Sequence, residues 1–253
     1  MLELKNVSFS VEDGEQLEIV RDVSLTIDSN KFVVITGPNG SGKSTLAKLI
    51  AGILTPTEGQ ILFEGEDITG LSITERAKRG IGFAFQAPVR FKGLTVHDLL
   101  KIAAGQEISV SSACTYLSEV GLCAKDYIDR EINASLSGGE LKRIEIATVL
   151  ARKTKLTVFD EPEAGIDLWS FQNLIRIFEG MRRDIKDSSI LIISHQERIL
   201  NIADEIVVLE AGQIKSVGAK DEVYPQVLGT EAGARMCFGQ AAEKEEQSVT
   251  QGC

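Results

Sequence analysis

Cysteine and histidine are scarce in this chain of 253 residues, which contains four cysteines and two histidines. The cysteines stand at positions 114, 123, 237 and 253, and no two of them have the close spacing that is typical of metal sites. We therefore expect no four-ligand zinc or metal-cluster site in this chain, and we interpret the cysteines as reduced thiols.

Excess positive charge and long apolar runs are also missing. Lys and Arg total 27 against 37 Asp and Glu, which gives a formal net charge of -10. Because nucleic-acid binding depends on basic residues that neutralise phosphates, we expect no nucleic-acid partner. The longest apolar runs, such as residues 32–35, are far shorter than the roughly 20 residues of a membrane-spanning helix. Residues 1–5 lack the features of a signal peptide, so the sequence predicts a soluble, cytoplasmic protein without direct membrane insertion.

The hydrophobic pattern changes along the chain in a way that predicts an α/β fold. Residues 2–11 and 23–27 alternate apolar and polar side chains, as antiparallel strands exposed on one face do. Short, continuous apolar runs then alternate with helical patterns, which is typical of a parallel core sheet covered by helices. These runs are residues 32–36, 156–159, 190–194 and 206–209. Residues 91–134 show helical periodicity, and we place an inserted helical subdomain at about 91–150.

We expect one domain in residues 1–228. A chain of this length with 43% apolar residues can bury one large core. Residues 229–253 end in a small, charged and polar stretch that is too poor in large apolar groups to order itself. We predict that they form a mobile C-terminal tail.

A glycine-rich segment follows the first buried run and leads into a helical pattern. It consists of Gly37, Pro38, Asn39, Gly40, Ser41, Gly42, Lys43, Ser44 and Thr45. Every fixed position of the phosphate-binding P-loop is filled, in the strand-loop-helix setting that this motif requires. Glycines let successive backbone N–H groups face the phosphates, and the helix N-terminus favours negative charge. We predict that Lys43 contacts the outer phosphates of a nucleotide and that Ser44 ligates Mg²⁺.

A second motif narrows the class of P-loop protein. Residues 136–140 read Leu-Ser-Gly-Gly-Glu, open a helical stretch and precede the apolar strand that ends in Asp160 and Glu161. This order resembles the ATP-binding cassette (ABC) ATPases. The resemblance implies hydrolysis of Mg-ATP by a dimer, normally a homodimer, in which a second ABC subunit completes each site. The residues that would reach the γ-phosphate held by the other subunit are Ser137, Gly138 and Gly139. Ser137 also suits the N-cap of its helix, and the two interpretations coexist.

The same resemblance assigns roles around the phosphates. Asp160 would reach Mg²⁺ from the end of its strand, and Glu161 would act as the general base for the attacking water. Gln86 matches the glutamine that contacts Mg²⁺ or that water, and His195 matches the switch histidine beside the γ-phosphate. Residues 163–167 stand at the D-loop position but depart from its usual serine-containing form. The implied catalytic residues are Lys43, Gln86, Glu161 and His195.

The aromatic side chain on which ABC ATPases usually stack adenine is missing. By register, Val11 occupies that position, with Phe9 on the same strand face. We therefore expect weak base stacking and loose discrimination between ATP and GTP.

The sequence says less about the partner that ATP hydrolysis drives. Residues 140–146 read Glu-Leu-Lys-Arg-Ile-Glu-Ile, where transporter subunits usually have glutamine followed by Arg and Ala. This segment resembles the SufC family of iron-sulfur cluster assembly ATPases, which implies a soluble Suf-type scaffold protein as partner. Pro162 and residues 91–96 instead resemble transporter cassettes, in which the latter segment meets a membrane subunit. We predict a SufC-like ATPase and keep the ATP-binding subunit of a membrane ABC transporter as the alternative.

Overall fold

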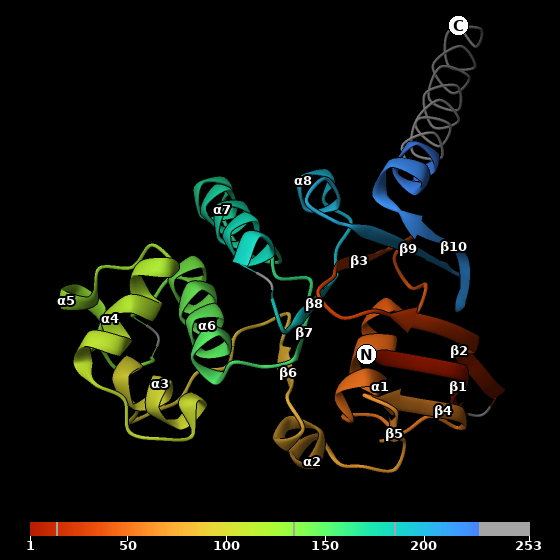
Figure 1. Ribbon diagram of the computed structural model, residues 1–253, viewed down its shortest axis with the longest axis horizontal. Coiled ribbons are helices and arrows are strands. Elements are labelled where there is room, and N and C mark those ends of the chain that lie inside the picture. The colour runs from red at the N-terminus through yellow and green to blue at the C-terminus, as the bar shows by residue number, and fades with distance from the viewer. Residues whose placement is uncertain (14, 134, 185, 228–253) are drawn as a thin grey trace, which may run out of the picture.

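Two β-sheets and a group of helices make up the part of the chain that the computed structural model describes (Figure 1). The described residues are 1–13, 15–133, 135–184 and 186–227. The predicted tail at 229–253 lies outside them, and its mobility stays a prediction.

The smaller sheet is antiparallel and has the strand order β2-β1-β4-β5. Its strands are β1 (Leu2–Asp13), β2 (Glu15–Ile27), β4 (Glu58–Phe63) and β5 (Glu66–Asp67). Leu2, Leu4 and Val7 of β1 are buried, as the alternating pattern predicts. β2 begins well before the predicted start at residue 23, because residues 15–20 also pair with β1.

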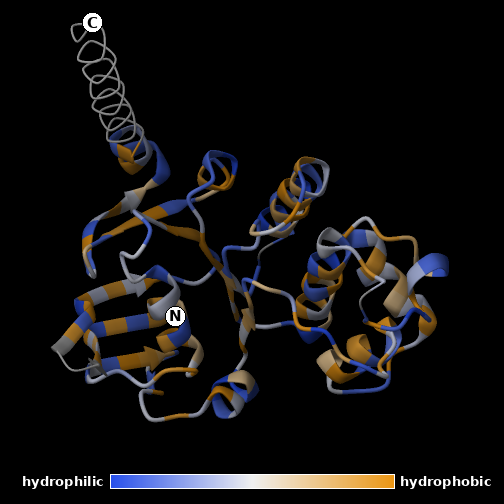
Figure 2. Cartoon of the chain, turned by 180° about the vertical axis from the view of Figure 1, so that it is seen from behind, coloured by the Kyte–Doolittle hydropathy of each residue, from blue (hydrophilic) through white to orange (hydrophobic). Residues whose placement is uncertain are grey.

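The larger sheet has the strand order β10-β9-β3-β8-β7-β6. Its strands are β3 (Phe32–Thr36), β6 (Ile81–Ala84), β7 (Leu156–Asp160), β8 (Ser189–Ile193), β9 (Glu205–Glu210) and β10 (Gln213–Ala219). All pairs are parallel except β9 with β10, which is antiparallel. Every residue of β3, β7 and β8 is buried, and these strands form an apolar band through the molecule in Figure 2. The expected strands buried on both faces are therefore present.

Helices cover both faces of the larger sheet and produce two cores. On one face, α1 (Lys43–Ala51) buries Leu46, Leu49 and Ile50 against apolar residues of both sheets. On the other face, α6 (Gly138–Arg152) and α7 (Leu168–Asp184) share a core with the helical lobe. The remaining helices are α2 (Ile73–Lys78), α3 (Val96–Ala104), α4 (Val110–Glu119), α5 (Ala124–Tyr127) and α8 (Glu197–Leu200).

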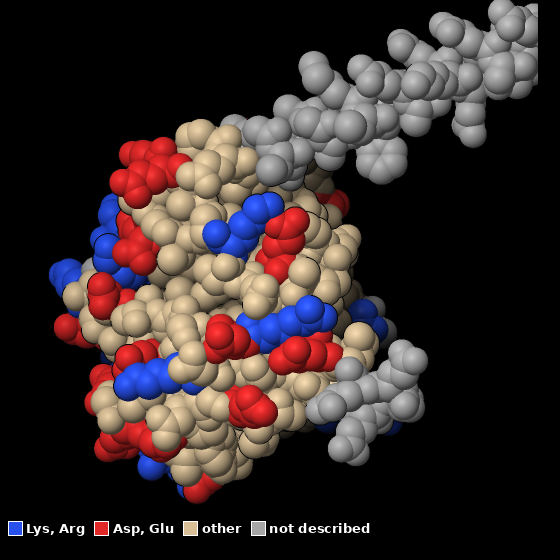
Figure 3. Space-filling model, turned by 90° about the vertical axis from the view of Figure 1, so that its right-hand side faces the viewer, with Lys and Arg blue, Asp and Glu red and all other residues tan. Residues whose placement is uncertain are grey.

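The predicted fold class is confirmed: a parallel core sheet, an N-terminal antiparallel layer and an inserted helical lobe built from α3 to α6. The helical lobe lies beside the core sheet and away from the antiparallel layer in Figure 1. Within the described residues, no helix combines the length and the apolar character that crossing a bilayer requires. Figure 3 shows acidic and basic side chains interspersed on one face of the molecule.

Candidate active site

The predicted site segments gather at one edge of the core sheet. The P-loop follows β3, Glu161 follows β7, His195 follows β8 shortly after its last residue, and Gln86 comes just after β6. The carboxyl ends of parallel strands meet at the same edge, where open α/β sheets bind their ligands. The topology therefore brings together residues that are far apart in the sequence.

The P-loop adopts its course because glycine stands at two crowded positions. Gly37 has a φ of 142°, and a β-carbon added there would lie 1.9 Å from the carbonyl oxygen of Leu209. Gly42 is the N-cap of α1 with a φ of 96°, and an added β-carbon would lie 2.7 Å from the carbonyl oxygen of Ile19. Since other residues rarely adopt such angles and would clash here, the loop requires glycine at both places.

Lys43 is buried, and its side chain forms hydrogen bonds with the backbone of the P-loop. Its Nζ donates to the carbonyl oxygens of Gly37 and Pro38, at 2.8 Å each. Burial lowers the pKa of Lys43, while the nearby Glu161 and Asp160 carboxylates raise it. The hydroxyl of Ser41 is buried and has no hydrogen-bond partner among the described residues. A cation and a free hydroxyl inside a loop of backbone N–H groups suit a phosphate chain.

Ser44 and Asp160 lie together at the end of β7. The Ser44 hydroxyl donates to Asp160 Oδ1 at 2.7 Å, and Asp160 is buried at the end of β7. A hydroxyl and a carboxylate are hard oxygen ligands of the kind that Mg²⁺ takes alongside substrate phosphates. The residues present therefore fit Mg²⁺ with Ser44 and Asp160 as its protein ligands.

Glu161 stands beside the P-loop in a strained conformation. Its φ of 42° lies in the left-handed region, which is uncommon for a residue with a side chain. Its backbone N–H donates to the carbonyl oxygen of Ile193 at 3.0 Å, and its Oε2 accepts from Gln86 Nε2 at 2.6 Å. Glu161 also lines the same cavity of about 350 Å³ as Lys43 and Ser44. The Gln86 amide thus holds the Glu161 carboxylate beside the P-loop cavity.

Not every predicted residue joins this cluster. His195 is exposed, and its Nε2 lies 3.3 Å from Gln196 Nε2. The signature residues Ser137 and Gly138 are exposed at the start of α6 and do not line the P-loop cavity. The structure thus brings Lys43, Ser44, Asp160, Glu161 and Gln86 together, and it leaves the signature segment apart from them.

The signature segment is an N-cap, as its sequence predicts. The hydroxyl of Ser137 accepts from the Glu140 N–H at 3.2 Å, and Glu140 Oε2 accepts from the Ser137 N–H at 2.7 Å. This capping box fixes the first turn of α6. Gly139 is packed so closely on α7 that an added β-carbon would lie 2.3 Å from Ser170 Oγ. The exposed positions Ser137 and Gly138 remain accessible to a ligand from outside the chain.

Three features of the site were missed by sequence reasoning. The side chain that lines the P-loop cavity from β2 is Ile19, whereas Val11 is not among the lining residues. Glu163 accepts from the Ser194 hydroxyl at 2.5 Å, and burial raises the pKa of Glu163. The third is a buried ion pair between Lys142 and Glu145. No local pattern marks these contacts. Those of Ile19 and Glu163 join segments that are adjacent only in the fold, and Lys142 and Glu145 are charged residues, which are rarely buried.

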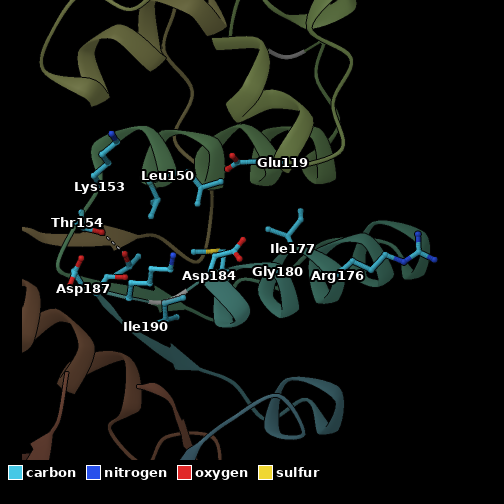
Figure 4. A pocket seen from close by; sticks show the side chains of 15 residues that line it. Glu119, Leu150, Lys153, Thr154, Arg176, Ile177, Gly180, Asp184, Asp187 and Ile190 are labelled. Atoms are coloured by element: carbon cyan, nitrogen blue, oxygen red, sulfur yellow. Dashed lines mark hydrogen bonds between the residues drawn. The ribbon is translucent and has the colours of Figure 1, made fainter. Parts of the chain in front are cut away.

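A separate cavity of about 590 Å³ lies between the C-terminal halves of α6 and α7. Figure 4 shows Leu150 and Lys153 on the α6 side and Ile177 and Asp184 on the α7 side. None of the predicted site residues lines it. Its position at the opposite end of these helices from their N-termini separates it from the phosphate site.

Comparison with known proteins identifies the class. The sequence profile described as ABC transporter matches residues 20–164. The uncharacterized ABC transporter ATP-binding protein MJ0035 of Methanocaldococcus jannaschii is 39% identical over 214 residues, which are 81% of this chain and 85% of that protein. The sulfate/thiosulfate import ATP-binding protein CysA of Pseudomonas syringae pv. tomato is 32% identical over 88% of this chain and 68% of its own length.

Solved structures agree with this class. The ADP conformation of MJ1267, an ATP-binding cassette of an ABC transporter, is 29% identical with a TM-score of 0.76 and covers 92% of this chain and 98% of its own. A dimeric post-hydrolysis structure of the cassette MJ0796, bound to ADP and Pi, is 24% identical with a TM-score of 0.77 over 87% of this chain and 99% of its own. At this identity, the second likeness supports the fold alone.

None of these relatives is described as a SufC protein. They do not support the SufC-like part of the sequence prediction, and their descriptions favour its transporter alternative. The profile nevertheless covers more than half of the chain, including the P-loop, the signature, Asp160 and Glu161. The chain therefore belongs to the ABC transporter family of ATP-binding cassettes, and it is an ATPase that uses ATP with Mg²⁺.

Proposed function

We propose that this chain is the ATP-hydrolysing subunit of a membrane transporter. The observation that carries the proposal is its similarity, over most of its length, to proteins described as transporter or import ATP-binding proteins. The spermidine/putrescine import protein PotA of Mesoplasma florum is a further example, 32% identical over 88% of this chain and 63% of its own length.

In this proposal each residue at the sheet edge has a separate role in ATP hydrolysis. Lys43 shifts from the loop carbonyls to the outer phosphates, and Ser44 and Asp160 hold Mg²⁺, which neutralises phosphate charge when bound. Glu161 orients the attacking water and accepts its proton. Gln86 donates to Glu161 and so fixes the direction of that carboxylate. His195 supports the γ-phosphate from the end of β8.

The site is completed by a second copy of the chain. Ser137 and Gly138 present the open N-terminus of α6 to solvent, yet they do not line the cavity of their own P-loop. A helix N-terminus with free N–H groups favours a phosphate. In a dimer with twofold symmetry, each α6 N-terminus would meet the nucleotide on the other copy.

The partner would dock beside Gln86. Phe85, Val89 and Phe91 are 38%, 48% and 38% exposed, and the basic residues Arg90 and Lys92 flank Phe91 in the sequence. Apolar side chains grouped on a surface mark interaction sites. Because this surface adjoins the residue that holds Glu161, a partner seated there would sense the nucleotide.

A SufC-like assembly role is the second candidate, and it rests on the resemblance of residues 140–146. In that case the same surface would receive a soluble Suf-type scaffold protein. The two candidates therefore differ in the chemistry of the partner.

Capture of the tagged, full-length chain from detergent-solubilised cells tests this proposal. We expect an integral membrane subunit to copurify with the wild type and to be lost with Phe91→Asp, because the substitution places a charge in an apolar contact. Val217→Asp is the matched control, since Val217 is 52% exposed on β10. Both variants should bind ATP normally. Copurification of a soluble scaffold, lost in the same variant, would overturn the transporter proposal and favour the second candidate.

A further inference from the structure

The chain contains a single tryptophan, and its side chain is 77% exposed. Trp169 stands in the first turn of α7, next to Leu168, which is 64% exposed. Tryptophan carries a large apolar surface that is normally well buried. Two adjacent exposed side chains of this size therefore indicate a surface that a binding partner covers.

The turn that carries them is fixed rather than loose. Asp167 Oδ1 accepts from the backbone N–H groups of Trp169 and Ser170, at 2.9 and 3.0 Å. Asp167 Oδ2 also accepts from the Ser170 hydroxyl at 2.7 Å. Asp167 thus caps α7 in the manner of an N-cap residue. The direction of both apolar side chains is set by this cap before any partner arrives.

Their position places them beside the signature segment. Ser170 faces α6, because a β-carbon added at Gly139 would lie 2.3 Å from its Oγ, and a β-carbon added at Gly138 would lie 3.3 Å from Gly165 O. Successive helix positions differ by about 100°, so Trp169 lies about a quarter turn and Leu168 about half a turn around α7 from the side that faces α6. α7 also follows the carboxyl end of β7, and its first turn lies at the same edge of the sheet as the phosphate site.

We propose that Leu168 and Trp169 form an apolar anchor that a second copy of this chain covers in the ATP-bound dimer. The inference rests on the composite site of the proposed function, in which the neighbouring Ser137 and Gly138 face that second copy. A surface next to these residues, on the same edge, is continuous with the interface. Tryptophan anchors of this kind dominate many protein interfaces, and in a twofold dimer the pair would contribute from both sides. The loop at residues 87–94, assigned above to the transporter partner, is a separate surface.

The single tryptophan makes its own burial measurable. Glu161→Gln in the full-length chain, with Mg-ATP, should form a dimer in sedimentation experiments. Because all tryptophan emission comes from Trp169, the emission should shift to shorter wavelength and acrylamide quenching should fall several-fold. Glu161→Gln combined with Ser137→Arg should stay monomeric and show neither change.

Substitution tests whether the contact also stabilises the dimer. In the Glu161→Gln chain, Trp169→Ala should weaken ATP-dependent dimerisation by about 30-fold or more, the effect of an interface hot spot. Trp169→Phe should retain most of the affinity, and Ile102→Ala, at an apolar position on α3 that is 63% exposed, should have no effect.

The outcomes separate this inference from the proposed function. A dimer in which Trp169 stays exposed, and in which Trp169→Ala has no effect, overturns the anchor but leaves the composite site standing. Absence of any ATP-dependent dimer overturns both. Shielding of Trp169 only in a complex with a membrane subunit would assign the surface to that subunit and overturn the anchor.

Discussion

Replacing Lys142 by methionine removes the cation of a buried ion pair that holds the segment before Gln86. Lys142 Nζ lies 2.8 Å from Glu145 Oε2 and donates to the Phe85 carbonyl oxygen at 2.6 Å. Glu145 Oε1 accepts from the Phe85 N–H at 3.0 Å. The side chains of Lys142 and Glu145 are only 2% and 15% exposed. Both backbone groups of Phe85 are therefore fixed by side chains of α6.

Methionine keeps most of the side-chain volume but leaves the Glu145 carboxylate buried without its cation. Removing one partner of a buried pair destabilises a protein by about 3–5 kcal/mol. For a domain of this size, each kcal/mol lowers Tm by about 2–4 °C, so we expect a loss of about 10 °C in thermal unfolding followed by circular dichroism.

The loss should depend on pH. Burial raises the pKa of Glu145 and Lys142 lowers it, so the variant should have a still higher folded-state pKa. A carboxyl whose folded pKa exceeds its unfolded pKa loses stability as pH rises from the unfolded value through the folded value. The Tm difference between Lys142→Met and the wild type should therefore shrink as pH falls toward the unfolded pKa of the carboxyl, because Glu145 of the folded variant is then protonated.

An exposed pair provides the control. Lys155 and Glu64 form an ion pair with side chains 50% and 45% exposed, and Lys155→Met should destabilise the protein by at most about 1 kcal/mol. Adding Glu145→Gln to Lys142→Met should restore part of the lost stability, since no buried charge remains. A Lys142→Met variant as stable as Lys155→Met, or a loss that does not vary with pH, would refute this account of the pair.

Three further predictions concern the nucleotide site. Glu161→Gln should bind Mg-ATP normally but hydrolyse it about 100- to 10,000-fold more slowly, the range of general-base effects; near-normal steady-state turnover would rule out this role. GTP should compete with ATP within about tenfold in binding assays, since stacking worth ~1–3 kcal/mol is missing, and Ile19→Tyr should tighten ATP binding; a preference for ATP above about 100-fold would contradict this. Glu163→Gln should raise Tm near neutral pH but not below the unfolded pKa of the carboxyl, because burial raises the pKa of Glu163 and its charged form therefore destabilises the fold; an equal shift at both pH values would show another cause.

The parts of the fold that were predictable are those that the sequence specifies locally. The buried strands were recognised because strands covered on both faces need continuous apolar residues, as in β3, β7 and β8. The P-loop was recognisable because its backbone course depends on contiguous glycines. The cluster of Ser44, Asp160 and Glu161 was predictable once the parallel strands had been identified, because such strands end at a common edge of the sheet.

Contacts between distant segments were not predictable in this way. β2 was expected to begin at residue 23, yet pairing with β1 extends it to Glu15. Ile19 of β2 lines the P-loop cavity and Val11 does not, although register against the ABC ATPases had pointed to Val11. Lys142 is a charged residue in a helix and would ordinarily be assigned to the exposed face, but its partners Glu145 and Phe85 bury it.

The same contacts give residues 140–146 roles within the cassette. Glu140 closes the capping box with Ser137 and also accepts a hydrogen bond from Tyr127. Lys142 and Glu145 hold the backbone of Phe85. These residues therefore serve packing within the cassette, and their resemblance to the SufC family does not itself report which protein docks outside it.

The composite site is the central claim, and a mixing experiment tests it most directly. Ser137→Arg blocks the signature of its own chain and spares its P-loop, whereas Lys43→Ala does the reverse, so each homodimer should be inactive. Random pairing at equal concentrations makes half of the dimers mixed, each with one intact site, and we expect about a quarter of the wild-type ATPase activity. Activity in the mixture no higher than in either variant alone, with mixed dimers confirmed by differential tagging, would contradict the claim.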